Sequence, residues 1–214
     1  MNDCFILTTS NHPLFDELSR LDIPFYEKLP ENPLPVAFDF TITDLREKER
    51  TLKFLSDKKC SIISDLGPYW GDDLMRRYPA IKGAFAASFP SLQKKIEVHS
   101  PCEKSMKLLE ELLGKLDMSS LVMEEAGVGF YYPRIPSLII NDAYFAKQEK
   151  LAEEDAVDTA MKYGVNYPQG PFEWTKKIGA FSIKLLLEEL YRATKDARYM
   201  PADALLEEAK RRSV

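Results

Sequence analysis

No glycine occurs before Gly67, although the chain of 214 residues contains nine. Proteins that bind a dinucleotide on a parallel sheet need glycines directly after the first strand, because only a bare backbone lets the phosphates approach a helix N-terminus. Here the turn after the first predicted strand reads Thr-Thr-Ser-Asn-His-Pro over residues 8–13. Its side chains exclude a conventional dinucleotide loop. Ser10 and Asn11 could instead cap the next helix or bind a lone anion.

Cysteine and histidine are also scarce. The three cysteines, at positions 4, 60 and 102, are odd in number and lack metal-site spacing. We therefore expect reduced thiols, a cytoplasmic location and no metal. The first residues show no secretory-signal pattern, and no run of eighteen apolar residues predicts a membrane span. A formal net charge of -5 and a pI near 5.3 disfavour nucleic acid or an anionic membrane as partner.

Short apolar runs alternate with amphipathic stretches over the first 128 residues. Strands that alternate with helices predict a compact α/β domain with a mostly parallel sheet. The predicted strands are Cys4–Thr9, Ile23–Tyr26, Val36–Phe40, Ser61–Ser64, Ile81–Ala87 and Ile96–His99. The predicted helices are Pro13–Leu21 with Asn11 as its N-cap, Thr43–Leu55 and Pro101–Leu116.

From Ile135 onward the pattern is helical almost to the end of the chain. The predicted helices are Ile135–Glu149, Ala152–Tyr163, Phe172–Lys177, Ile183–Thr194 and Ala202–Arg212, separated by glycine and proline. The change of pattern falls near Gly129–Pro133. We therefore predict two domains, an α/β domain over residues 1–130 and an all-α domain over residues 131–214.

The most informative run is Asp158–Glu173, which reads Asp-Thr-Ala-Met-Lys-Tyr-Gly-Val-Asn-Tyr-Pro-Gln-Gly-Pro-Phe-Glu. Physically it is a helix closed by Gly164, a rigid Tyr-Pro-Gln-Gly-Pro turn, and a second helix that begins through Pro171. The same run resembles the signature of the C-terminal helical domain of the 3-hydroxyacyl-CoA dehydrogenase family. Leu186–Tyr191 and Asp196–Pro201 resemble a later helix of that domain and its following turn.

The resemblance implies a partner and a ligand for the helical domain. In the family this domain forms the dimer interface and one wall of the acyl-CoA cleft, so a homodimer and an acyl-CoA or other acidic metabolite are expected. The apolar stretch Ser137–Phe145 offers more apolar surface than one small helical layer need bury. Burial inside the domain itself is the alternative explanation of that stretch.

The α/β half resembles the same family more faintly, and the resemblance implies a degenerate Rossmann-like domain. Val36–Asp39, followed by Leu45–Lys48 at a helix start, resembles the family's fourth strand and next helix. This places Lys48 where the family has a cofactor-contacting lysine, although a solvated lysine is the alternative for a charged helix. The resemblance also places Ser88 and Arg134 near the substrate.

The family removes the proton of a 3-hydroxyl with a histidine, oriented by a glutamate, while hydride passes to NAD. In register with Gly83, the histidine position holds Phe85 and the glutamate position keeps Glu97. A phenyl ring cannot accept a proton, and loss of a general base costs about 10²- to 10⁴-fold in rate. Pro133 replaces a further family asparagine. Glu97 is therefore expected to be vestigial, and no NAD cofactor is expected.

Three functions remain open from the sequence. We expect a 3-hydroxyacyl-CoA dehydrogenase relative that has lost NAD-dependent catalysis but keeps dimerisation and the binding of an acyl-CoA or another small ligand. One alternative is an active NAD-dependent enzyme of fatty-acid or acyl-CoA metabolism with an unusual site, built on Glu97 and His99, which share one face of a strand. Another alternative is an interaction subunit for a full-length dehydrogenase. His12 is expected to contact solvent or a helix end.

Overall fold

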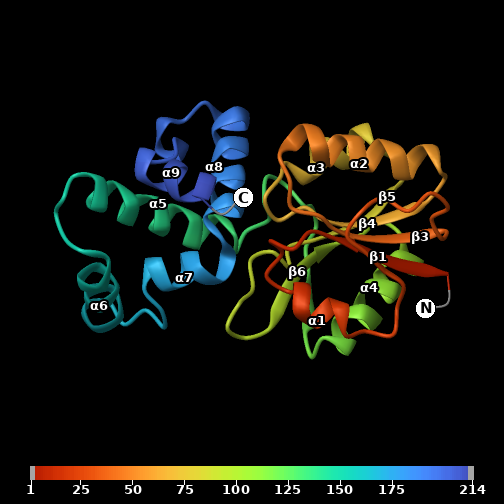
Figure 1. Cartoon of the computed structure of the whole chain (residues 1–214), viewed down its shortest axis with the longest axis horizontal. Coiled ribbons are helices and arrows are strands. Elements are labelled where there is room, and N and C mark those ends of the chain that lie inside the picture. The colour runs from red at the N-terminus through yellow and green to blue at the C-terminus, as the bar shows by residue number, and fades with distance from the viewer. Residues whose placement is uncertain (1–2, 212–214) are drawn as a thin grey trace. The chain divides into compact units, whose positions relative to one another are not determined.

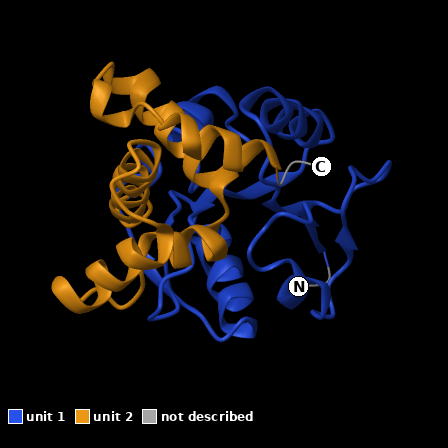
Figure 2. Ribbon diagram, turned by 60° about the vertical axis from the view of Figure 1, so that its left-hand side comes forward, with its two compact units in different colours: residues 1–130 blue, residues 131–214 orange. Residues whose placement is uncertain are grey.

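The computed structural model describes residues 3–211. These residues divide after Phe130 into two compact units, which are coloured separately in Figure 2. The first unit is α/β and the second is helical (Figure 1), which confirms the predicted fold class.

The first unit is built on one seven-stranded sheet in the order β2-β1-β3-β4-β5-β6-β7. Neighbouring strands are parallel throughout except for β5 and β6, which are antiparallel. The strands are β1 (Cys4–Thr8), β2 (Phe25–Tyr26), β3 (Val36–Phe40), β4 (Ser61–Asp65), β5 (Ile81–Phe85), β6 (Lys95–His99) and β7 (Ser119–Val122). The apolar runs of the sequence thus form a buried parallel sheet, as such runs commonly do.

Four helices cover the two faces of this sheet. They are α1 (Phe15–Ser19), α2 (Leu45–Asp57), α3 (Gly71–Arg77) and α4 (Glu103–Lys115). In Figure 1, α2 and α3 lie over one face, and α1 and α4 lie over the other. Leu18 of α1 and Leu109 of α4 pack with Ile6, Phe38 and Ile63 of the strands in one buried apolar cluster. Burial of these side chains holds α1 and α4 on the sheet.

One local prediction for this unit needs correction, and two elements of the unit were missed. Asn11 is not a helix cap, because α1 begins only at Phe15 and the Asn11 side chain bonds to Ile42 instead. Helix α3 was not predicted, although Asp72 and Asp73 in its first turn and two arginines in its last turn are favourable for a helix. Strand β7 was also not predicted, because its four residues are mostly exposed and show no apolar period.

The second unit contains α5 (Arg134–Gln148), α6 (Glu154–Gly164), α7 (Pro171–Ile178), α8 (Ala180–Thr194), the short 3₁₀ helix η1 (Ala197–Tyr199) and α9 (Asp203–Arg211). Helices α5, α7, α8 and α9 pack on one another, and α6 packs on α7. The last predicted helix included residue 212, which lies outside the described residues. None of the helices within residues 3–211 is both long enough and apolar enough to cross a membrane.

A buried asparagine holds the second unit together. Asn141 of α5 donates from its side-chain amide to the carbonyl of Met200 at 2.9 Å and accepts from the N–H of Ala202 at 2.9 Å. Asn141 and Ala202 are fully buried. The two bonds connect α5 to the turn before α9 across roughly sixty residues of chain, and satisfy backbone groups that no helix or strand pairs.

We expect Asn141→Ala to lower the free energy of unfolding of this unit by about 2–4 kcal/mol, because it leaves the buried N–H of Ala202 without a partner and removes the hydrogen bond to the Met200 carbonyl. Urea denaturation followed by circular dichroism measures this loss. Asp142→Ala, at the next and exposed position of α5, serves as the control and should change little. Equal midpoints for the two variants would contradict the assigned role of Asn141.

Candidate functional site

The candidate site lies at the carboxyl ends of the parallel strands in the first unit. Strand β2 pairs with one edge of β1 and β3 pairs with the other, so the chain crosses from one side of β1 to the other. In open α/β sheets, the crevice outside the strands at this crossing point is where ligands bind. The loops after β1 and β3 therefore decide whether a nucleotide can enter.

Side chains join these two loops directly. The Asn11 amide donates to the Ile42 carbonyl at 2.9 Å, and the Ile42 N–H donates to the hydroxyl of Thr9 at 3.0 Å. The two bonds run in opposite directions between the loops. The loops after β1 and β3 are thus joined directly by the protein's own groups.

His12 lies in the loop between β1 and α1. It is 3% exposed, and its Nδ1 accepts a hydrogen bond from the N–H of Leu14, at the start of α1. Its Nε2 lies 3.1 Å from Oδ2 of Asp65. Because Nδ1 is an acceptor, the neutral ring carries its proton on Nε2 and donates it to Asp65. The expected solvent contact was wrong, whereas the contact with a helix end is present.

Asp65, at the end of β4, accepts hydrogen bonds from four donors. Besides His12, it accepts from the N–H of Gly67 at 2.9 Å and from both the N–H (2.6 Å) and the hydroxyl (3.0 Å) of Ser88. A Cβ at Gly67 would lie 2.8 Å from the Ser88 hydroxyl oxygen, so the loop needs glycine there. This carboxylate is saturated, as a buried charge must be.

A second saturated carboxylate lies on the opposite face of the sheet. Asp39 of β3 pairs with Nζ of Lys48 at 2.8 Å, and neither side chain is exposed. Asp39 also accepts from the N–H and hydroxyl of Thr41 and from the hydroxyl of Ser64. The Lys48 amine donates further to the Thr41 carbonyl and lies 5.2 Å from the ring centre of Tyr69.

The structure corrects one reading of Lys48 and qualifies another. Lys48 is not a solvated lysine of a charged helix, because α2 buries it completely against the sheet. A cofactor-contacting role was the other reading. In this structure, the hydrogen bonds of the amine go to Asp39 and Thr41, which leaves the charge engaged within the protein.

These residues do not fit the pyrophosphate of a dinucleotide. The turn after β1 has no glycine, a buried imidazole takes the N–H at the start of α1, and two anionic carboxylates already use the nearby donors. A phosphate in this place would have to displace His12 and would meet the negative charge of Asp65. Within the described residues, no group of three or more His, Cys, Asp or Glu side chains could hold a metal ion either.

The residues predicted at the family's catalytic positions lie close together on β5 and β6. Phe85 ends β5, is fully buried, and packs its ring 4.8 Å from that of Phe40 in the core cluster. Glu97 lies in the middle of β6 and is 8% exposed. His99 ends β6, and its Nδ1 lies 3.1 Å from the Met123 carbonyl. The ring at position 85 is thus part of the apolar core.

The two predicted substrate residues belong to different units. Ser88 is fully buried in the first unit, and both its hydroxyl and its N–H donate hydrogen bonds to Asp65. Arg134 is the first residue of α5 in the second unit and is half-buried there. Ser88 therefore has a structural role, and a substrate role for Arg134 stays a prediction.

Residues of the signature run in the second unit stabilise the N-terminus of helix α7. The carboxylate of Asp158, on α6, accepts from the N–H groups of Phe172 at 2.9 Å and Glu173 at 3.2 Å in the first turn of α7. Gly170 precedes this turn and has no side chain to cap it. The Asp158 carboxylate fills that role from the neighbouring helix, where a negative charge is also favoured by the helix dipole.

Glu173 completes this arrangement. Its carboxylate accepts from the N–H of Gly170 at 3.0 Å and pairs with Lys162 of α6. The hydrogen bond from Lys162, together with that from Gly170, lowers the pKa of Glu173. The spacing of the run thus encodes a junction between two helices.

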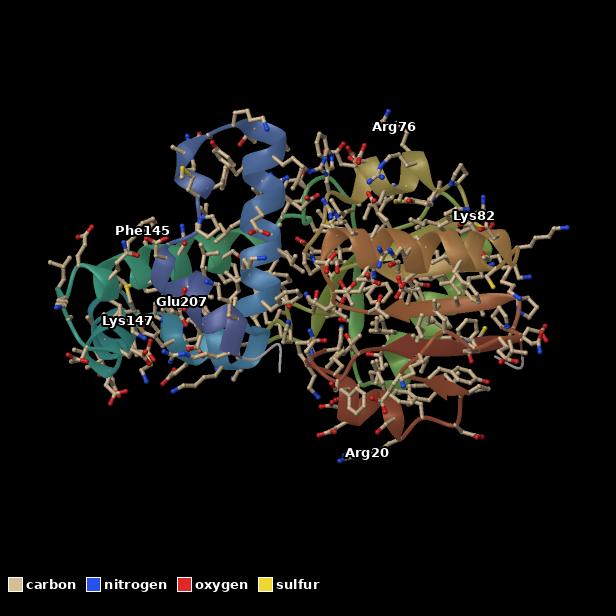
Figure 3. The ribbon with its side chains drawn as sticks, turned by 45° about the horizontal axis from the view of Figure 1, so that its top comes forward. Arg20, Arg76, Lys82, Phe145, Lys147 and Glu207 are labelled. Atoms are coloured by element: carbon tan, nitrogen blue, oxygen red, sulfur yellow. The ribbon has the colours of Figure 1, made fainter. Side chains whose placement is uncertain are left out.

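Sequence reasoning missed Asp39, Asp65 and Asp158 as the organising carboxylates. A signal was available for the first two, because each is the lone charged residue at or next to the end of a buried strand. Charges exposed to solvent look different. Arg20 and Arg76 project away from the ribbon in Figure 3, as solvated side chains do.

The comparisons with known proteins agree with the architecture of the second unit. Residues 129–212 match the family described as 3-hydroxyacyl-CoA dehydrogenase, C-terminal domain. The 3-hydroxyadipyl-CoA dehydrogenase of Escherichia coli is 42% identical over 76 residues, which are 36% of this chain and 16% of that protein. A probable 3-hydroxybutyryl-CoA dehydrogenase of Deinococcus radiodurans is 28% identical over 51% of this chain and 39% of its own length.

Solved structures extend the likeness to the whole fold. The (S)-3-hydroxybutyryl-CoA dehydrogenase of Ralstonia eutropha covers 97% of this chain and 93% of its own, with a TM-score of 0.64 at 16% identity. The 3-hydroxybutyryl-CoA dehydrogenase of Escherichia coli covers 71% of this chain and 32% of its own, with a TM-score of 0.61 at 25% identity.

The chain spans less than half the length of the curated relatives it matches, between 16% and 39% of each. The matches nevertheless converge on one description, and they cover the signature run whose geometry is given above. Residues 129–212 are thus similar to the C-terminal helical domain of the 3-hydroxyacyl-CoA dehydrogenase family.

Proposed function

We propose that this chain is a member of the family that does not carry out NAD-dependent hydride transfer. The observation that carries the proposal is the set of hydrogen bonds at the carboxyl ends of β1, β3 and β4. Asn11 joins the loop after β1 to the loop after β3, and His12 in the first of these loops bonds to the buried Asp65 at the end of β4. A nucleotide would have to break this arrangement and leave the buried Asp65 without one of its four donors, which is costly.

The position of the family's base supports the same proposal. Phe85 is fully buried in the apolar core, so no small rearrangement brings a proton acceptor to that point. Glu97 keeps the family's glutamate position, but the position of the histidine that this glutamate orients holds Phe85 here. General-base catalysis commonly contributes about 10²- to 10⁴-fold in rate, and the proposal removes it together with the hydride acceptor.

What the chain keeps, in this proposal, is association through the helical unit and recognition of an acyl-CoA thioester. The junction of α6 and α7 is intact, and α5 carries apolar surface such as Ile135, which is 61% exposed. The named relatives act on 3-hydroxyadipyl-CoA or 3-hydroxybutyryl-CoA, which points to a related thioester. Exposed apolar surface of this kind favours a homodimer.

Two measurements test the catalytic part. We expect no quenching of NADH fluorescence by the protein up to millimolar NADH, and no acetoacetyl-CoA-dependent loss of NADH absorbance. The 3-hydroxybutyryl-CoA dehydrogenase of Escherichia coli serves as the positive control under identical conditions. Turnover that disappears in Glu97→Gln would overturn the proposal and establish the active alternative.

The association part has separate readouts. Light scattering after gel filtration should give twice the 24.5 kDa of one chain, and short acyl-CoAs should raise the melting temperature where NAD and NADH do not. A monomer that no acyl-CoA stabilises would contradict this part while leaving the catalytic part standing.

A further inference from the structure

The buried tyrosine Tyr69 touches three parts of the first unit at once. Its hydroxyl donates to the carbonyl of Thr43 at 2.7 Å and accepts from the N–H of the same residue at 3.0 Å. Its ring lies under the Lys48 amine, and its backbone carbonyl accepts from the N–H of Gly129 at 2.9 Å. Burial raises the pKa of Tyr69, so the hydroxyl keeps its proton and donates.

Gly129 belongs to a segment that we call the strap, residues 126–130, which ends the first unit just before the second begins. The strap is held by short contacts to residues 69–72. Trp70 and Val128 form an antiparallel bridge, and the N–H of Ala126 donates to the carboxylate of Asp72 at 3.2 Å. The N–H of Asp72 in turn donates to the Gly127 carbonyl at 3.4 Å.

The strap has an unusual backbone that depends on these contacts. Gly127, Gly129 and Phe130 all have positive φ, of 55°, 71° and 54°. A bulky residue such as Phe130 rarely adopts this conformation, yet it is 2% exposed here. Such conformations persist only where the surrounding structure holds them.

We propose that the Asp39–Lys48–Tyr69 cluster is a conformational clamp that fixes the strap, and with it the point where the chain leaves the first unit. Tyr69 links the cluster to the strap. The backbone N–H and carbonyl of Thr43 fix the orientation of the Tyr69 ring, and the backbone carbonyl of the same tyrosine accepts from the N–H of Gly129. Holding the side chain of Tyr69 therefore also holds the carbonyl that binds Gly129. The inference does not depend on whether the protein binds NAD or catalyses a reaction.

The first test uses Tyr69→Phe, which removes the hydroxyl but keeps the ring and the carbonyl. Amide exchange followed by NMR should become at least tenfold faster at Gly129 and Phe130, while amides within β3 keep their wild-type protection. Tyr78→Phe, at a half-buried tyrosine after α3, is the matched control and should leave the strap unchanged. Wild-type exchange at Gly129 in a folded Tyr69→Phe protein would overturn the clamp.

A second variant perturbs the strap through the contact between Gly71 and Ala126. A Cβ at Gly71 would lie 2.6 Å from the Cβ of Ala126, so Gly71→Ala must push the strap away. Exchange should rise at Gly129 and, because coupling is reciprocal, at the Thr43 amide bound to Tyr69. Adding Ala126→Gly removes the clash and should restore both amides. Faster exchange at Gly129 with an unchanged Thr43 amide would show that the strap and the cluster are independent, which would overturn the proposal.

Discussion

Replacing Lys48 by methionine is expected to lower the free energy of unfolding of the first unit by about 3–5 kcal/mol, because removal of one partner leaves a buried charge unpaired. Methionine fills nearly the same volume, so the loss reports the charge of Asp39 more than a cavity. Both side chains of the pair are fully buried, so water cannot replace the amine. Urea titration monitored by far-UV circular dichroism measures the change.

A second substitution, at Asp39, should recover part of the stability that Lys48→Met loses. Asp39→Asn added to Lys48→Met takes away the orphaned charge but keeps an oxygen for the N–H and hydroxyl of Thr41. We expect the double variant to be more stable than Lys48→Met alone, since well-packed neutral groups often replace buried ion pairs without loss. Lys53→Met, on the solvent side of α2, is the control and should leave the midpoint unchanged. A Lys48→Met protein as stable as this control would contradict the assignment.

Gly170→Ala is expected to have a comparably large effect on the second unit. A Cβ at this position would lie 2.2 Å from Cγ and 2.4 Å from Cβ of Asp158. Asp158 must therefore move and lose its bonds to the first turn of α7. A lost cap costs about 0.5–2 kcal/mol and a forced contact about 1–3 kcal/mol, so we expect urea titration to give a loss of about 2–5 kcal/mol.

Two further variants separate the clash from a general intolerance of alanine. Gly164→Ala, at the end of α6, meets no atom within 4 Å and should change stability little. Asp158→Ala does not rescue Gly170→Ala, because the Cβ at position 158 is itself too close; only Asp158→Gly relieves the contact, at the cost of the cap. Rescue by Asp158→Ala would show that the backbone contact is looser than described.

Local patterns predicted much of this fold because they record burial. The apolar runs ending at Phe40 and at Asp65 give strands, and the period of α4 gives a helix, whichever face each covers. The turn at Pro168–Pro171 could also be predicted, because glycine and proline restrict the backbone by themselves. Elements with little burial, such as β7, leave no such record.

The candidate site depended on pairings that no local pattern contains. His12 and Asp65 are separated by 53 positions, and the bond between Asn11 and Ile42 spans 31. The missing glycines predicted that a pyrophosphate would not fit the first loop, but they could not indicate which side chains join the loops. The charged pattern of α2 likewise suggested a solvated Lys48, because periodicity cannot show that a lysine's partner is an aspartate in the facing strand.

The packing of Asp158 against Gly170 gives the signature run a structural purpose of its own. The spacing of the run is set by the folding of a helical junction, which the domain needs whether or not the protein turns over a substrate. Recognition through this run therefore reports ancestry and architecture, and activity must be judged from the other half of the molecule.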